Sequence, residues 1–240
     1  FAQKTMAIVL LLATIPYLAL QPRAAGIVIS AIFGGPEWVG AVLVTLIVII
    51  YTLRGGLEAV VKTDLIQAII ALTLLWIGLV LVLSNAGGPK EAFTKLLSID
   101  PLLMGRADKY LLIIWSSTLL LWLFADPMFP QLFQRLCASE NDKAIGKMAM
   151  LYPLVATLAF LPPIIIGTLG HLNYHGLDRS SSDTILPLMI MEIGGEWLGG
   201  LILIAGLAAL MSTMDSQLLS TGSLVVRDLA PEFTKEKNYQ

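Results

Sequence analysis

The stretch Ala208-Ala209-Leu210-Met211-Ser212-Thr213-Met214-Asp215-Ser216 places hydroxyls and a carboxylate inside a long apolar segment. The chain carries no charge between Glu196 and Asp215, and its apolar character resumes from Leu218 to Val226. A helix from about Trp197 to Val226 is long enough to cross a bilayer, for which about 20 residues suffice. Polar groups near the middle of such a helix are costly, so they predict a functional site.

The composition of the whole chain is that of a membrane protein. Hydrophobic residues make up 57% and charged residues 13% of the 240 residues, and the mean hydropathy is +0.82. Soluble domains carry about 25% charged residues. The formal net charge is −2 and no basic patch appears, so no nucleic acid partner is expected. The single Cys137 excludes an intrachain disulfide framework.

Six apolar segments predict membrane-spanning helices, so the expected fold class is an all-α multi-pass membrane protein. Backbone groups within lipid must be satisfied inside the span, and the period-2 alternation of a membrane barrel is absent. The turn Gly55-Gly56 separates the second and third spans, and Asp126-Pro127 breaks the fourth. We treat residues 1–240 as one transmembrane unit with a cytoplasmic tail at 231–240. The predicted spans are about 5–32, 38–53, 59–83, 110–133, 148–172 and 197–226.

The basic residues between the spans predict the orientation. Nine Lys and Arg residues fall on one side and five on the other, with Arg23 left inside a span. Because cytoplasmic loops carry the excess of positive charge, both ends of this segment are predicted to be cytoplasmic, in a plasma membrane. The chain begins at Phe1 rather than Met, and we expect it to be a piece of a longer protein.

The sixth span presents oxygen atoms along one face. Ala209, Ser212, Thr213 and Ser216 are spaced i, i+3, i+4 and i+7, so they lie on the same side of a helix. Two hydroxyls and the Ala209 carbonyl offer three neutral oxygens to a hard cation such as Na⁺. Alternatively, Ser and Thr serve close packing between helices or bond back to their own helix. The helix pattern alone favours packing.

Three motifs, in this order and spacing, resemble the sodium/solute symporter family, which includes proline, pantothenate and sugar symporters. They place nearly the whole chain within that family's core helices three to eight. The motifs are the segment 51–67, with Tyr51-Thr52, Gly55-Gly56, Thr63-Asp64 and Gln67; Gln134-Arg135 with Ala138 and Ser139; and the segment 208–220.

The resemblance implies part of a LeuT-type bundle of two inverted five-helix repeats, with ion and solute near the membrane midplane. It implies that the Ser212 and Thr213 hydroxyls and the Ala209 carbonyl bind Na⁺. The remaining ligands would be carbonyls of the first core helix, which is outside this chain. Asp64, at the cytoplasmic start of the third span, would take part in Na⁺ release. Alternatively, it is a helix-start carboxylate favoured by the helix dipole.

The fourth span contributes candidates for a solute cavity. Asp126 precedes Pro127 where a proline interrupts the helix, so its carboxylate is expected to line the cavity. It would bind a cationic or hydroxylated solute, carry a proton, or pair with Arg23. Trp122 and Phe124 are candidate cavity aromatics, although aromatic residues in membrane helices often only pack.

Arg23 lies inside the first predicted span and requires a partner of opposite charge. Asp126, Asp215, a residue outside this chain and a carboxylate on the solute are the alternatives, and Gln21 adds a polar contact. Asp215 itself is interpreted as mainly structural.

No residue pattern indicates an enzyme or a resident cofactor. His171 and His175 are spaced to share a metal on a helix, but no further ligand is near, so Na⁺ is the only metal expected. No nucleophile-base pair and no phosphate-binding glycine loop appear.

The sequence therefore predicts a secondary active transporter that couples Na⁺ to a small organic solute by alternating access. The expected partners are Na⁺, the lipid bilayer and an amino acid, carboxylate, vitamin or sugar. The alternative is a symporter-like solute-sensing module of a signalling protein, which the sequence beyond Gln240 would decide.

Overall fold

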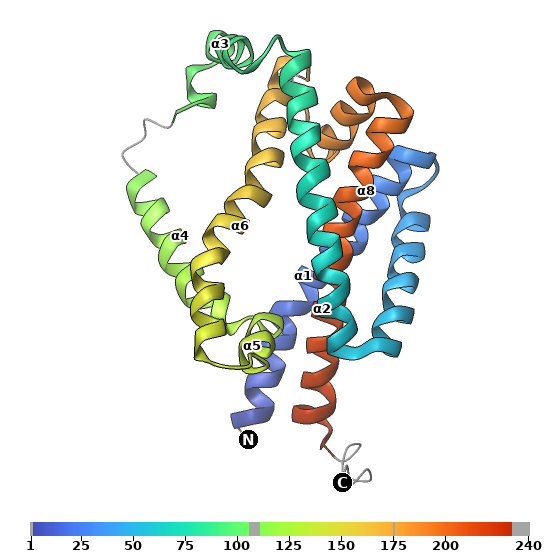
Figure 1. The fold of residues 1–240 in the computed structure, drawn as a ribbon, viewed down its shortest axis with the longest axis vertical. Helices are drawn as coiled ribbons and strands as arrows, with labels where there is room; N and C mark the ends of the chain where they lie inside the picture. Colours follow the sequence, from blue (N-terminus) through green and yellow to red (C-terminus); the bar gives the residue numbers. More distant parts are fainter. Residues whose placement is uncertain (1, 106–110, 175, 232–240) are drawn as a thin grey trace.

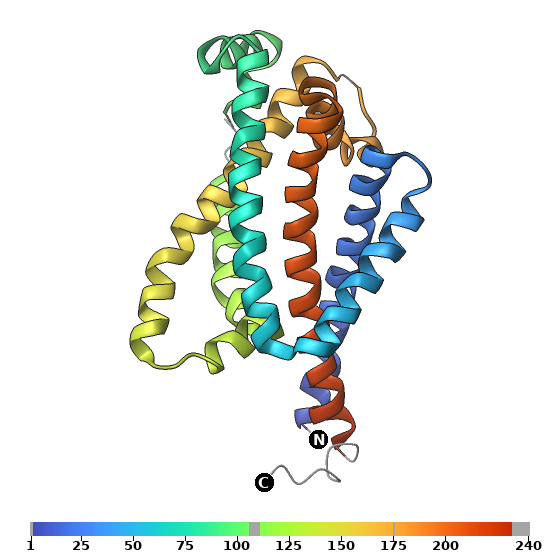
Figure 2. The same cartoon turned by 45° about the vertical axis from the view of Figure 1, so that its right-hand side comes forward.

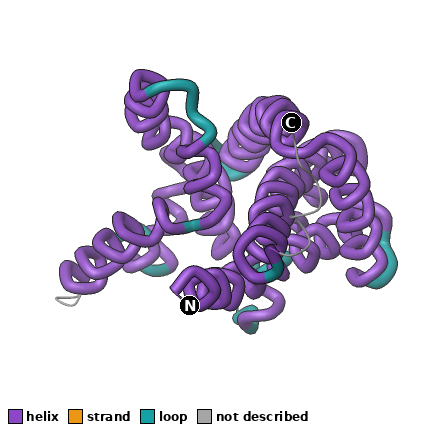
Figure 3. Tube along the Cα trace, turned by 90° about the horizontal axis from the view of Figure 1, so that it is seen from below, coloured by secondary structure: helices purple, strands orange, loops and turns teal. Residues whose placement is uncertain are grey.

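The computed structural model describes residues 2–105, 111–174 and 176–231, and this part of the chain consists of helices joined by short loops (Figures 1 and 3). The elements are α1 (Ala2–Phe33), α2 (Glu37–Asn85), α3 (Pro89–Ile99), η1 (Pro101–Leu103), α4 (Leu111–Ala125), η2 (Asp126–Met128), α5 (Pro130–Cys137), α6 (Asp142–Leu169), η3 (Gly170–Leu172), α7 (Arg179–Ser182), α8 (Ile185–Ser223) and the π-helical η4 (Leu224–Leu229).

Within the described residues, six helical stretches are long and apolar enough to cross a membrane. This finding confirms the predicted all-α multi-pass fold class. The six stretches are Ala2–Phe33, Glu37–Glu58, Val60–Asn85, Leu111–Met128, Asp142–Leu172 and Ile185–Leu229.

Two glycines bend long helices. Gly56 has φ 57° and ψ −156°, so the two halves of α2 meet at the turn that the sequence predicted. Gly195 has φ 66° and ψ −175° and divides α8 just before the predicted start of the sixth span. Residues with a Cβ atom rarely adopt such angles. The residues 185–194, which lie between the fifth and sixth predicted spans, are helical because they form an apolar run that ends at this glycine.

The fourth predicted span ends earlier than expected. α4 stops at Ala125, the single turn η2 follows, and α5 begins at Pro130. Pro127 has no backbone donor, which accounts for the break at this place. The crossing stretch therefore ends at Met128 rather than at residue 133.

The segment 84–109, between the third and fourth predicted spans, contains the helix α3, which lies across one end of the bundle (Figure 1). Ala92 and Leu96 of α3 are fully buried and anchor it there. Residues 106–109 of that segment, residue 110 of the fourth span and residues 232–240 of the predicted tail lie outside the described residues.

α8 is the central helix of the bundle. It packs against α1, α2, α5, α6 and η4, and in Figure 2 it runs between the teal second half of α2 and the blue α1. The start of α1 and η4 lie at the same end of the bundle, where Gln3 Nε2 donates a hydrogen bond of 2.8 Å to Asp228 Oδ1. α4 contains no buried residue and lies at the edge.

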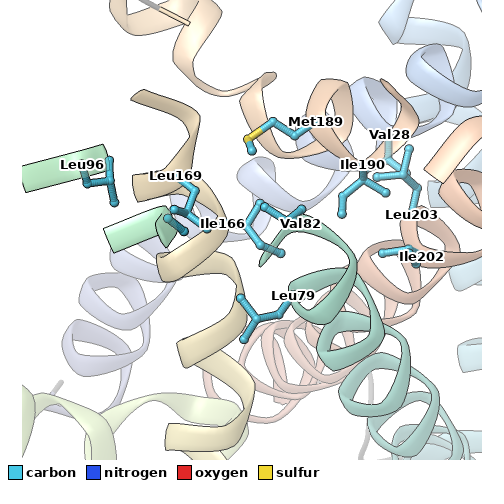
Figure 4. Packing of buried hydrophobic residues seen from close by; sticks show 11 residues of the cluster. Val28, Leu79, Val82, Leu96, Ile166, Leu169, Met189, Ile190, Ile202 and Leu203 are labelled. Carbon is cyan, nitrogen blue, oxygen red and sulfur yellow. The ribbon is translucent and has the colours of Figure 1, made fainter. Parts of the chain in front are cut away.

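The larger of two buried apolar clusters lies in the half of the bundle near α3. Figure 4 shows side chains from α1, α2, α3, α6 and α8 meeting there, among them Val82, Leu169, Ile190 and Leu203. Because lipid tails are as apolar as these side chains, tight packing and not removal from water holds such helices together.

α1 and α2 approach closely at two glycines. A Cβ atom on Gly26 would lie 2.3 Å from the carbonyl oxygen of Glu37, and one on Gly40 would lie 2.6 Å from Ile29 Cβ. Small residues at such positions allow the backbones of membrane helices to come together.

We expect Gly26→Ala to destabilise the full-length protein by about 1–3 kcal/mol, because the added methyl group has no room. The melting temperature of the purified protein measures this effect. The control is Gly146→Ala, where a Cβ atom meets nothing within 4 Å. A loss of stability as large in the control as in Gly26→Ala would contradict the prediction.

Candidate functional site

A cavity of about 680 Å³ lies between α1, the α4–α5 break, α6 and α8. Its wall combines hydroxyls, two charged groups and several aromatic rings. Its lining residues include Tyr17, Trp122, Asp126, Phe129, Arg135, Tyr152, Phe160, Ser212, Thr213 and Ser216.

Two of the predicted Na⁺ ligands, Ser212 and Thr213, lie on the α8 wall of this cavity. Thr213 Oγ1 donates a hydrogen bond of 3.2 Å to the Ala209 carbonyl, so these two oxygens are neighbours. Ser212 Oγ donates a hydrogen bond of 2.5 Å to Asp64 Oδ1. A hydroxyl that donates its proton keeps oxygen lone pairs for another partner. This arrangement is compatible with cation binding by the neutral oxygens.

Asp64 lies against α8 and belongs to a cluster that joins three helices. Its carboxylate forms an ion pair with Arg135 of α5. Arg135 Nη2 also donates a hydrogen bond of 2.5 Å to Ser216 Oγ. We name Asp64, Arg135, Ser212 and Ser216 the Asp64 cluster. Asp64 thus contacts the predicted Na⁺ ligand Ser212 directly. Its position at the start of a predicted span does not by itself indicate this contact.

Arg135 is a site residue for which the sequence analysis assigned no role. The Gln134-Arg135 motif identified the family, but the pairing with Asp64 is separated by 71 residues in the chain. The sequence did offer one signal for this pairing: Asp64 and Arg135 are residues of opposite charge in two motifs of the same family.

Asp215 is fully buried and holds a second link between α2 and α8. Tyr51 donates a hydrogen bond of 2.7 Å to Asp215 Oδ2, and Ser216 Oγ lies 3.2 Å from Asp215 Oδ1. Its mainly structural interpretation agrees with these contacts.

Arg23 pairs with a residue that the sequence analysis did not consider. Its Nη2 lies 3.0 Å from Asp183 Oδ2, and both side chains are more than half exposed. Asp126 and Asp215, two of the alternatives considered for its partner, do not form this pair. A long arginine side chain carries its charge away from its own Cα atom, and here it extends to the segment that precedes α8. Gln21 is buried within α1, and neither Gln21 nor Arg23 lines the 680 Å³ cavity.

Of the two aromatic residues predicted to line a solute cavity, the structure places one in the cavity wall. Trp122 lines the cavity, but Phe124 is 69% exposed and does not. Two residues along a helix are about 200° apart, so the two side chains face opposite directions. Tyr17, Tyr152 and Phe160 line the cavity and were not predicted, because single aromatic residues on α1 and α6 form no local pattern.

His171 contacts its own helix end, where Nδ1 lies 3.2 Å from the Thr168 carbonyl. His175 lies outside the described residues. In the described part of the chain, no group of three or more His, Cys, Asp or Glu residues is placed to hold a metal ion. The expectation that Na⁺ is the only metal stays a prediction.

Comparisons with known proteins agree with the motifs. The sodium/pantothenate symporter of Haemophilus influenzae is 30% identical over 78% of this chain and 39% of its own length. The high-affinity proline transporter of Bacillus subtilis is 27% identical over 89% of this chain and 45% of its own length. The human high affinity choline transporter 1 is 26% identical over 86% of this chain and 37% of its own length.

The chain thus spans less than half the length of these relatives, all of which are transporters. Membership of a transporter family agrees with the prediction that the chain is not an enzyme. No solved structure matches. The model of the family described as "Sodium:solute symporter family" matches residues 2–240, and the chain belongs to this family.

Proposed function

We propose that the complete protein couples Na⁺ entry to the uptake of a small organic solute by alternating access. The observation that carries the proposal is the placement of Ser212 and Thr213 on the wall of a cavity large enough for a solute, with the Ala209 carbonyl hydrogen-bonded to Thr213. Membership of the sodium:solute symporter family supports the same activity.

In this proposal the described helices belong to a LeuT-type bundle, and Na⁺ joins α8 to a helix outside this chain. The hydroxyls of Ser212 and Thr213 and the Ala209 carbonyl supply one side of the ion's coordination. Na⁺ binding would hold the two helices together and favour the state that is open to the outside. Neutral oxygens bind a monovalent cation weakly enough for it to leave again.

The Asp64 cluster supports a route for the release of Na⁺. One oxygen of Asp64 accepts a hydrogen bond from Ser212, so the carboxylate is adjacent to the proposed ion ligands. The other oxygen faces Arg135, whose positive charge offsets that of the carboxylate. A carboxylate whose charge is partly offset in this way would attract Na⁺ from the site toward the cytoplasm without trapping it.

The membrane placement is also a proposal. The excess of Lys and Arg on one side supports a plasma-membrane protein with both ends of this segment in the cytoplasm. The contact between Gln3 and Asp228 places the start of α1 and η4 at one end of the bundle, as this orientation requires. The relatives named for pantothenate, proline and choline leave the solute class open.

The proposed Na⁺ ligands are tested by the thermal stabilisation of the purified full-length protein at increasing Na⁺, with K⁺ keeping the ionic strength constant. Ser212→Ala and Thr213→Val each remove one oxygen ligand. We expect each to raise the Na⁺ concentration for half-maximal stabilisation about tenfold or more, since a lost polar contact to a charged group costs about 1.5 kcal/mol or more.

The matched control is Thr45→Val. Thr45 Oγ1 donates a hydrogen bond of 2.7 Å to the Ala41 carbonyl, the same local bond that Thr213 makes to Ala209. It should leave the Na⁺ midpoint unchanged. If all three variants retain the wild-type midpoint, the ligand assignment is wrong. If solute uptake follows a proton gradient and is indifferent to Na⁺, Asp126 becomes the coupling residue.

The pairing of Asp64 with Arg135 is tested by a double-mutant cycle on thermal stability. Arg135→Gln leaves the half-buried Asp64 carboxylate unpaired, so it should destabilise more than Asp64→Asn/Arg135→Gln does. We expect a coupling energy of about 1–3 kcal/mol.

The control cycle uses Glu58 and Lys62, whose side chains are 82% and 72% exposed. Their coupling should stay below about 0.5 kcal/mol, as for other exposed helix pairs. Equal coupling energies in the two cycles would contradict the prediction that the Asp64–Arg135 pair contributes more to stability than an exposed pair.

A further inference from the structure

We propose that the solute carries a positively charged ammonium group, which the Asp126 carboxylate and the aromatic rings of the cavity hold. This inference rests on the proposed function, because it takes the cavity beside Ser212 and Thr213 as the solute cavity. It names the charge class of the solute, which the family leaves open.

The charge of the cavity wall is the first argument. Asp126 and Arg135 are the charged residues that line the cavity. Arg135 is already paired with Asp64 and bonded to Ser216. The ion pairs in the described part of the chain are Arg23–Asp183, Lys62–Glu58, Lys95–Glu91 and Arg135–Asp64, so none of them includes Asp126.

Asp126 is half-buried and lies in a membrane-spanning stretch. A carboxylate at such a place is costly unless a positive charge accompanies it. A solute with an ammonium group supplies that charge when it binds. A solute with only a carboxylate would be repelled by Asp126 and would find Arg135 already engaged.

The aromatic rings are the second argument. The ring centroids of Tyr17 and Phe129 are 6.0 Å apart, and those of Trp122 and Phe129 are 6.4 Å apart. These three rings therefore form one continuous wall. Tyr152 on α6 also lines the cavity.

The face of an aromatic ring is electronegative and attracts ammonium groups, most strongly when they are alkylated and poorly hydrated. A carboxylate that lines the same cavity as such rings favours an alkylated ammonium ion over a sugar, whose many hydroxyls require many hydrogen-bond partners. It also favours a cation over a zwitterion, because the cavity offers no unpaired positive side chain to a solute carboxylate.

The test compares two probes that share a shape and differ in charge. Choline contains a quaternary nitrogen, and 3,3-dimethylbutan-1-ol contains a neutral carbon at the same place. We expect binding of radiolabelled choline to the full-length protein in Na⁺, with the neutral alcohol competing at least tenfold more weakly than unlabelled choline. Glycine betaine, a zwitterion, should fall between them or below both. Equal competition by choline and the alcohol overturns the proposal.

Variants locate the interaction. Asp126→Asn should weaken choline binding tenfold or more and leave competition by the neutral alcohol unchanged. Trp122→Leu should weaken choline binding severalfold. The matched controls are Phe124→Leu, an aromatic residue that does not line the cavity, and Glu140→Gln, an exposed acid outside it. Both should bind choline as the wild type does.

Thermal stabilisation by Na⁺, measured for every variant, separates the possible failures. If Na⁺ stabilises the protein and Ser212→Ala shifts the midpoint, but charge makes no difference to solute binding, only the ammonium proposal fails. If choline binds selectively but Na⁺ has no effect, only the proposed Na⁺ coupling fails. If Asp126→Asn retains Na⁺ stabilisation and the wild-type preference for choline, Asp126 is not the recognition group and the proposal is wrong.

Discussion

The arrangement of the bundle depends on the need of the α8 polar face for partners within a membrane-spanning segment. Ser212 bonds to Asp64, Asp215 accepts a hydrogen bond from Tyr51, and both partners come from α2. Arg135 adds α5 to the same cluster. Because unsatisfied polar groups are costly at this depth, these contacts determine which side of α8 faces α2 and therefore which side faces the cavity.

The parts of the fold that depend on local sequence were predictable. Apolar length located the spans, and the turn at Gly56 and the break at Asp126-Pro127 follow from properties of single residues. The helical residues 185–194 and the amphipathic helix α3 were missed because segments of about ten residues are too short to span a membrane. Such segments become helical by packing on longer helices, which a span length does not report.

The site was predictable only in part, for a related reason. The oxygen-bearing face of α8 follows from helical spacing within one segment. Asp64 and Arg135 come from two motifs 71 residues apart, and their contact is a property of the packed bundle. For Arg23, the sequence suggested a buried charge that the structure does not show. Its position along a span suggested a deep charge, but its long side chain carries the guanidinium to Asp183.

The two proposed positive ligands place different demands on the same cavity. Na⁺ meets neutral oxygens at Ser212 and Thr213, so its binding leaves a full positive charge in a medium of low dielectric constant. An ammonium group nearby would repel it unless a carboxylate intervened, and Asp126 supplies that negative charge within the same cavity wall. A cycle that carries both ions inward moves two positive charges across the membrane. Each gains about 2.3 kcal/mol per 100 mV of inside-negative potential, so the potential would drive the loaded state toward the cytoplasm.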